Sequence, residues 1–328
     1  MPVAAPKTTH QPLLRNRAAD TPVDCVLLVR DLDRRQKRDS SPFLRMTLAD
    51  RSGTVPAVLW RAEADDEPAV EPGAPIHLHG KLTEHPRYGR QIVVSGLAEP
   101  DSQDIDWTRL VDGPARPTAE LLEDLDALLG SISDPGLARL MHRLLGADTP
   151  LGIAYRHAPA AKYNHHAYPH GLLEHSVQVA HLVSAGAAVF PSIERDLALC
   201  GALLHDIGKL DAYASVGASI DLTDPGRLEG EIPLGYYRVR REIEEHGDVP
   251  PELARRLLHI ILAHHGCLEH GSPVMPSTRE AAVVHAMDKL SGTMGAFDRL
   301  EKETAREESW SRFDRVLEAA AFFGSSDA

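Results

Sequence analysis

Hydrophobic and polar residues alternate in the first third of the chain, in short segments separated by turn residues. Each segment combines β-branched or aliphatic residues with a polar or Pro-Gly cluster, such as the turn at Asp50 to Gly53. A period of two predicts strands that bury one face. Five short strands in about 75 residues predict a small β-barrel of the OB type. The expected strands cover residues 23–33, 43–53, 54–62, 75–85 and 90–99.

From residue 118 onward the apolar residues recur at intervals of three and four, which predicts helices. The segment 118–132 has Thr118 as its expected N-cap, and the segment 134–146 ends on a glycine. We therefore expect this half of the chain to be an all-α helical bundle. The further expected helices cover residues 171–190, 195–210, 234–247, 250–266, 278–300 and 309–323.

The patterns divide the chain into two domains with connecting segments. An acidic, proline-bearing stretch between the domains is expected to be a linker that docks through Trp107 and Leu110. The expected parts are a flexible arm at residues 1–21, the OB barrel at 22–98, the linker at 99–117 and the helical domain at 118–320.

Composition is that of a soluble globular protein, with 43% hydrophobic and 25% charged residues among 328. Three cysteines are too few for a disulfide framework, so we expect a reducing cytoplasm. No apolar stretch approaches the roughly 18 residues of a membrane helix, so no membrane is expected. A net charge of −13 argues against a protein that coats nucleic acid through bulk electrostatics, but it leaves room for a local basic groove.

Histidine is concentrated in the helical half, where 13 of the 18 histidines lie between His157 and His285. The apolar run at residues 202–210, ALLHDIGKL, is interrupted by the adjacent His205 and Asp206. Burial of an unpaired charge is costly, so such a pair needs hydrogen bonds, an ion partner or a metal. The sequence of this segment alone does not decide between hydrogen bonds, an ion partner and a metal.

Other helices supply further histidines and an aspartate amid apolar residues. A lone histidine on such a face is more often a hydrogen-bonded core residue, but a bundle can converge several of them on a metal. Mixed His and Asp ligands suit Mn²⁺, Fe²⁺, Zn²⁺ or Mg²⁺, and the lack of cysteine argues against a thiolate zinc site. The candidate ligands are His175, His205, Asp206, His264, His265 and Asp288.

The order His175, His205-Asp206, Asp288 resembles the H…HD…D signature of the HD-domain phosphohydrolases. The segments AAKYNHHAYPHGLLEHSVQVA and LAHHGCLEHGSPVMPSTREAAVVHAMDKLSG, behind an OB-like domain, resemble the YhaM family of 3′→5′ exoribonucleases over about residues 22–300. One departure is clear. Where that family reads like GKLLGHISLG, this chain has GRLEGEIPLG, so Glu231 stands at the usual histidine position.

The resemblance implies a metal-dependent exonuclease that removes nucleoside 5′-monophosphates from the 3′ end of single-stranded RNA, with DNA as a further substrate. It implies one or two divalent ions, with Mn²⁺ expected first. His175, His205, Asp206 and Asp288 would hold one ion, and Asp206 would bridge to a second held by His264 or His265. Glu231 either completes that second site or weakens it.

Lys209, together with Asp206, is expected to take part in catalysis, because it lies one helical turn beyond His205 and can reach a phosphate oxygen. A solvated lysine interacting with the helix dipole is an equally good interpretation. Phosphate-binding or supporting roles are expected for His165, His166 and His285.

Two basic loops of the barrel, with aromatic residues nearby, suggest the stacking mode in which OB domains bind single strands. The alternative is a solvated charged loop, which the neighbouring Asp31, Asp33 and Asp39 favour. The candidate nucleic-acid-binding residues are Arg34, Arg35, Lys37, Arg38, Trp60, Arg87, Tyr88 and Arg90.

Two other functions remain open at this point. An HD phosphohydrolase that acts on small nucleotides is one, although a mononucleotide needs no strand-guiding barrel. An inactive nucleic-acid-binding regulator is the other, and the intact H…HD…D set counts against it. Homo-oligomerisation is compatible with the sequence.

Overall fold

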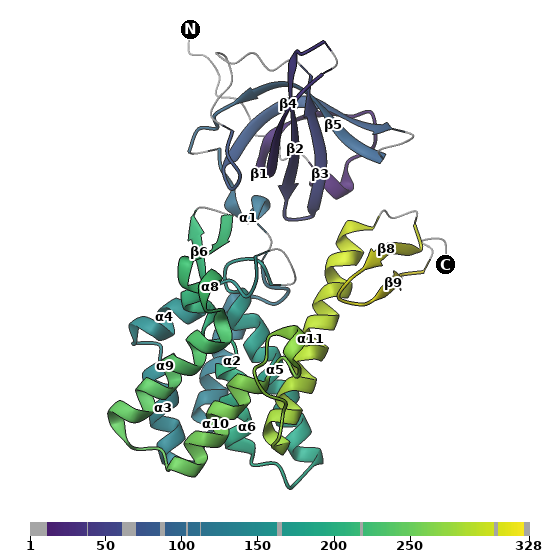
Figure 1. The fold of residues 1–328 in the computed structure, drawn as a ribbon. Coiled ribbons are helices and arrows are strands. Elements are labelled where there is room, and N and C mark those ends of the chain that lie inside the picture. Colours follow the sequence, from purple (N-terminus) through teal and green to yellow (C-terminus); the bar gives the residue numbers. More distant parts are fainter. Residues whose placement is uncertain are drawn as a thin grey trace. The chain divides into compact units, whose positions relative to one another are not determined.

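The computed structural model divides into two compact units, with the boundary near residue 112 (Figure 1). We describe each unit by itself. No helix among the described residues is long and apolar enough to cross a membrane. The structure describes residues 12–37, 39–60, 70–85, 89–102, 104–111, 113–162, 166–216, 219–304 and 308–324.

The first unit is a closed five-stranded barrel with the strand order β1-β2-β3-β5-β4, an OB fold (Figure 1). Strands β3 and β5 pair in parallel, and the other neighbours are antiparallel. All five expected strands are confirmed. Their bounds are Pro22–Gln36 for β1, Pro42–Asp50 for β2, Gly53–Leu59 for β3, Pro75–His85 for β4 and Gly89–Ala98 for β5.

Alternation from Phe43 to Leu48 in β2 shows why these residues form a barrel. Leu44, Met46 and Leu48 are buried in the barrel core, whereas Phe43 and Arg45 lie on the outer face. Burying one face of each strand fixes the pairing register, because a shift by one residue would exchange the two faces. The alternation of apolar and polar residues therefore determines which face of each strand is buried in the barrel.

Strand β1 changes partner along its length. Its first half pairs with β4 and its second half pairs with β2, with a register shift between Val29 and Asp31. The short helix α1, Trp107–Leu110, also packs on β1 and β2, and Leu110 is buried while Trp107 is largely exposed. Part of the expected linker is thus a helix of the barrel unit, held through Leu110.

The second unit is mainly helical. Helices α5 and α6 pack against each other and against α11, and α10 packs against α6 and α11. The first ten residues of α5 are almost all buried. Thr118 is the first residue of α2 and Pro117 is its N-cap, so the expected threonine cap is wrong. The helices are α2 Thr118–Gly130, α3 Pro135–Leu145, α4 Pro150–His157, α5 Gly171–Val189, α6 Arg195–Leu204, α7 Lys209–Ala212, α8 Asp224–Leu228, α9 Glu231–His246, α10 Pro251–Ala263 and α11 Arg279–Glu303, with 3₁₀ turns η1 Leu14–Asn16 and η2 Leu268–His270.

The helix expected over residues 309–323 is wrong, because this segment is a β-hairpin of β8, Trp310–Asp314, and β9, Ala319–Phe322. Asp314 Oδ1 accepts hydrogen bonds from the backbone N–H groups of Val316 and Leu317, which turns the chain back. A second two-stranded sheet joins β6, Tyr213–Val216, to β7, Ser219–Leu222. The helical unit is therefore not all-α.

Candidate metal centre

The His205-Asp206 pair lies in a tight turn, not inside a helix. Helix α6 ends at Leu204, and α7 starts only at Lys209, which corrects the continuous helix expected over residues 195–210. At Gly208 a Cβ atom would lie 1.9 Å from the backbone oxygen of Glu231, so only glycine lets α9 approach this closely. The approach brings the first residue of α9 beside the turn.

A first cluster of ligand atoms joins α5, the turn after α6, and α11. His175 Nε2 lies 3.1 Å from Asp288 Oδ1 and 3.4 Å from Asp206 Oδ2. His205 Nε2 lies 3.3 Å from Asp206 Oδ2 and 3.7 Å from Asp288 Oδ1. His175, His205 and Asp206 are buried, so these four side chains face one another in a site that largely excludes bulk water.

A second cluster lies on the other side of Asp206. His264 Nε2 lies 3.6 Å from Asp206 Oδ1, and His265 Nε2 lies 3.6 Å from Glu231 Oε1. The ligand atoms of Asp206, His264 and His265 all lie within 4.8 Å of one another. The two carboxylate oxygens of Asp206 therefore face different clusters.

Hydrogen bonds orient every histidine of these clusters in the same way. The Nδ1 atoms of His205, His264 and His265 lie 2.8, 2.7 and 2.8 Å from backbone carbonyl oxygens, to which they donate. His175 Nδ1 lies 3.1 Å from Ser291 Oγ, and this hydroxyl donates in turn to the Gln178 side chain. With Nδ1–H donating, each Nε2 keeps a lone pair directed into the cluster, the arrangement found in metal-ligating histidines.

The donor set fits a divalent cation. His175 Nε2 and His205 Nε2 are only 3.1 Å apart, and two lone pairs at that distance repel unless a cation or a proton lies between them. Among the described residues, the buried atoms Asp206 Oδ1 and His264 Nε2 have no hydrogen-bond partner. Buried polar atoms are almost always satisfied, so these two atoms fit a site that would hold a metal ion.

Lys209 sits against the shared carboxylate, with Nζ 2.6 Å from Asp206 Oδ2. Burial opposes ionisation of Asp206, but the Lys209 ammonium and the His205 ring hold its pKa well below the ordinary value. Burial likewise lowers the pKa of Lys209, and the Asp206 carboxylate raises it overall. Both groups are therefore charged at neutral pH, so Asp206 presents an ionised carboxylate to the two clusters.

Of the three histidines expected to support the site, two are described and His165 lies outside the described residues. His285 Nδ1 lies 2.7 Å from the backbone oxygen of His264 and donates to it, which supports the turn that carries His264. The ring of His166 lies 5.4 Å from that of His175, and its Nε2 lies 3.7 Å from Glu174. His285 thus braces the second cluster, and His166 lies beside the first.

Ser291 and Gln178 orient His175, and the sequence alone did not identify them. Each lies three residues from a candidate ligand on its own helix, since Gln178 follows His175 on α5 and Ser291 follows Asp288 on α11. Residues three apart share a helix face, and this spacing is the signal that could have found them.

The basic and aromatic residues expected on the barrel only partly gather on one face. The rings of Trp60 and Phe43 stack with centroids 5.3 Å apart, and Arg35 is the cross-strand neighbour of Phe43. Arg90 does not join them, because its guanidinium donates to the backbone oxygens of Leu14 and Arg17. Arg34 precedes Arg35 on β1 and Lys37 follows the strand, whereas Arg38, Arg87 and Tyr88 lie outside the described residues.

A helical unit that brings histidines and aspartates from four segments to one buried centre, in a chain that also carries an OB barrel, defines a class of protein. That class is the HD-domain phosphohydrolases linked to a nucleic-acid-binding barrel. The HD domain model matches residues 172–293, and the model described as an OB-fold nucleic acid binding domain matches residues 28–99. The match to the HD domain implies that this unit binds divalent metal ions.

Curated relatives narrow the class to one family. The chain is 30% identical to the 3′-5′ exoribonuclease YhaM of Halalkalibacterium halodurans, over 84% of this chain and 85% of the relative. It is 30% identical to the Bacillus subtilis protein of that name and 31% identical to that of Oceanobacillus iheyensis, each over 87% of the relative. The chain belongs to the YhaM family of 3′-5′ exoribonucleases.

Proposed function

We propose that this chain is a metal-dependent 3′→5′ exoribonuclease that hydrolyses single-stranded RNA to nucleoside 5′-monophosphates. The observation that carries the proposal is the position of Asp206 between two His-containing clusters, with Oδ1 orphaned opposite His264 Nε2. The relatives named 3′-5′ exoribonuclease YhaM support the direction of hydrolysis.

In this proposal, Asp206 would contribute a ligand to each of two sites for divalent ions. Oδ2 of Asp206, with His175, His205 and Asp288, would hold the first ion. Oδ1, with His264 and His265, would hold the second, and Glu231 lies close enough to His265 to join them. Such ions would lower the pKa of water and stabilise charge on the phosphoryl oxygens. We expect Mn²⁺ to be preferred, because borderline imidazole and hard carboxylate ligands occur together.

The protein groups around the clusters orient the ligands and keep Asp206 charged. The backbone carbonyls that accept from Nδ1 of His205 and His264 leave Nε2 as the ring nitrogen directed into the clusters. Lys209 keeps Asp206 ionised through a 2.6 Å ion pair. The Lys209 side chain remains 15% exposed, so we assign its remaining N–H donors to a phosphate oxygen of the substrate.

On the barrel, we assign RNA binding to the outer face of β1 and β2 together with Trp60. Trp60 is 47% exposed and stacks on Phe43, which gives a base a flat apolar surface. Arg35 and Arg45 lie beside Phe43 on that face and supply positive charge, and Arg34 adds charge on the same strand. Asp33 pairs with Arg35 at 2.6 Å and so neutralises part of the positive charge on this face.

The proposal is tested with a single-stranded RNA labelled at its 5′ end, incubated with the purified protein and Mn²⁺. We expect a ladder of products that shortens from the 3′ end and disappears with EDTA. Asp206→Ala protein, checked for native folding by circular dichroism, serves as the control without activity. A DNA strand of the same sequence measures the preference between RNA and DNA.

Two results would contradict the proposal. Intact RNA together with hydrolysed mononucleotides would indicate a phosphohydrolase of small nucleotides. Intact RNA and intact nucleotides, with RNA bound to the protein, would indicate a binding protein without catalytic activity.

A further inference from the structure

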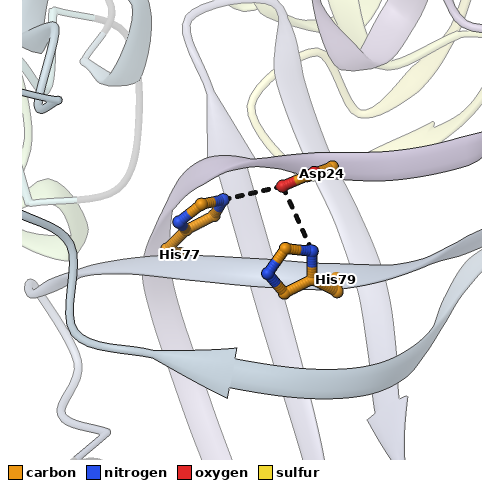
Figure 2. Close-up of side chains that lie close together, drawn as sticks. All are labelled: Asp24, His77 and His79. Carbon is orange, nitrogen blue, oxygen red and sulfur yellow. Dashed lines mark hydrogen bonds and ion pairs between the residues drawn. The ribbon is translucent and has the colours of Figure 1, made fainter. Parts of the chain in front are cut away.

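The outer surface of the barrel carries a second group of potential metal ligands, far along the sequence from the HD residues. His77 and His79 lie two residues apart on β4, so their side chains project from the same face of the strand. Asp24 is the cross-strand partner of His79 on β1. Figure 2 shows both imidazole rings directed towards the Asp24 carboxylate.

The three side chains converge on one point. His77 Nε2 lies 2.8 Å and His79 Nδ1 lies 3.2 Å from the same oxygen, Asp24 Oδ1 (Figure 2). The two rings are 4.9 Å apart and tilted by 36°. One ligand atom from each residue lies within 4.8 Å of the others, which is the spacing of donors around a single ion.

The chemistry of this trio suits a borderline transition metal. Two imidazoles and one carboxylate are the protein ligands of many zinc sites that keep an open coordination position. Asp24, His77 and His79 are 54, 32 and 52% exposed, so an ion can enter and water can complete its coordination. The ligands stand on paired strands, so the fold has already brought them together and little ordering is needed on binding.

Another group of potential ligands lies on the helical unit, and we do not propose it as a site because its carboxylates pair with arginines. Glu242, Glu245 and His246 also lie close together, on α9. There, Glu242 pairs with Arg143 at 2.6 Å and Glu245 pairs with Arg241 at 3.6 Å. Guanidinium groups thus already neutralise the helical cluster and compete with any metal ion for its oxygens.

We propose that Asp24, His77 and His79 form a binding site for Zn²⁺ or a similar ion such as Ni²⁺ or Co²⁺, separate from the HD metal centre. In the bound state, the ion would replace the contacts that now join the two imidazoles to Asp24. The ion also ties β4 to the first half of β1, two segments about 50 residues apart in the chain. Because the ion would bind the folded barrel and not the unfolded chain, its binding would stabilise the barrel.

The test compares Zn²⁺ binding to the full-length protein and to the variant His77→Ala/His79→Ala by equilibrium dialysis. We expect the double variant to bind one Zn²⁺ fewer per chain. His142→Ala/His181→Ala is the matched control, since these two exposed histidines each lie beside a single carboxylate and not beside each other. Equal Zn²⁺ binding by the parent protein and by the variant lacking His77 and His79 would overturn the proposal.

Hydrogen exchange locates the site independently of the HD residues. Zn²⁺ should slow amide exchange in β1 and β4 of the parent protein and of an Asp206→Ala variant, and it should have no such effect in His77→Ala/His79→Ala. Asp24→Asn keeps the shape of the side chain and removes its charge. This variant should need at least tenfold more Zn²⁺ to reach the same protection from exchange. Protection of the two strands that persists in the double variant would also overturn the proposal.

Discussion

The ring of His285 lies so close to Gly266 that a Cβ atom added at Gly266 would come within 2.2 Å of the ring. Gly266 has φ +84°, a conformation that L side chains rarely adopt, and it follows His264 and His265 directly. The ring cannot simply move aside, because its Nδ1 donates to the backbone oxygen of His264. Backbone conformation and side-chain packing therefore both require glycine here.

Gly266→Ala should destabilise the protein by about 2 kcal/mol more than Gly247→Ala, since overpacking adds to the cost of the left-handed backbone. Gly247 has φ +64° and no atom within 4 Å of the Cβ position, so it isolates the backbone cost. Urea unfolding measures both changes. Adding His285→Ala to Gly266→Ala should recover part of the loss, and strict additivity of the two would contradict the steric explanation.

Asp206→Asn should lower exonuclease activity by roughly three orders of magnitude, because about 4 kcal/mol of transition-state stabilisation depends on the metal ions. The amide keeps the shape of the carboxylate but removes the charge that both clusters share. Metal content by mass spectrometry should fall in parallel. Asp211→Asn is the matched control, because Asp211 pairs with Arg238 away from the clusters, and it should keep its metal.

Ser291→Ala should reduce Mn²⁺ affinity by about 10- to 100-fold, because removing a hydrogen bond to a ligating histidine has effects of this size. His175 would lose the acceptor of its Nδ1–H and with it the orientation of Nε2. The Mn²⁺ dependence of activity is the measurement. Ser291→Thr keeps a hydroxyl at this position and should keep the Mn²⁺ affinity. Thr293→Ala on the same helix is the control: the Thr293 hydroxyl donates to the Lys289 backbone oxygen, so its loss should leave the Mn²⁺ affinity unchanged.

Trp60→Ala should weaken binding of a long single-stranded RNA by about 1–3 kcal/mol, the contribution of one stacked base. Fluorescence anisotropy at fixed salt measures the affinity. Trp60→Phe should keep much of it, and Trp107→Ala serves as a control for another largely exposed tryptophan of the barrel unit. Turnover of a dinucleotide should be the same in all variants, and an equal loss on both substrates would argue against RNA binding by this face.

The loss of stability as pH falls should depend on Asp248. Hydrogen bonds from Arg143, opposed by partial burial and supported by Arg139, lower the pKa of Asp248 to about 2. A lowered pKa stabilises the folded state above the unfolded-state pKa of about 4, and this contribution disappears as pH falls through about 2. Asp248→Asn should therefore cost about 2 kcal/mol at pH 7 in urea unfolding, and the difference from the parent protein should shrink below pH 4. Asp148→Asn, which changes an exposed aspartate, should have little effect at any pH.

The strands of the barrel could be predicted from the sequence because burial of one face imposes alternation, as along β2. The hairpin of β8 and β9 could not. Its alanines at positions 319–321 have high helix propensity, and the turn depends on Asp314, which also pairs with Arg299 of α11 at 2.6 Å. Tertiary contacts override local propensity in this segment.

The candidate metal ligands could be selected from the sequence because a polar residue on an apolar helical face needs a partner. Their division into two clusters around Asp206 came from the resemblance to the YhaM family and not from helical periodicity, which does not predict the turn after α6. The group at Asp24, His77 and His79 was missed, since it exists only through the antiparallel register of β1 and β4. A strand pairing brings together residues that no local pattern connects.

The close approach of Gly208 to Glu231 has a consequence for how this family can change. Because backbone contacts set the separation of the turn from the start of α9, the residue at position 231 can be replaced without moving Asp206. A Glu231→His variant would thus place an imidazole at the attachment point where the carboxylate now stands. With Glu231 as a ligand of the second site, as proposed, this exchange would replace a hard oxygen ligand by a borderline nitrogen ligand on an unchanged scaffold.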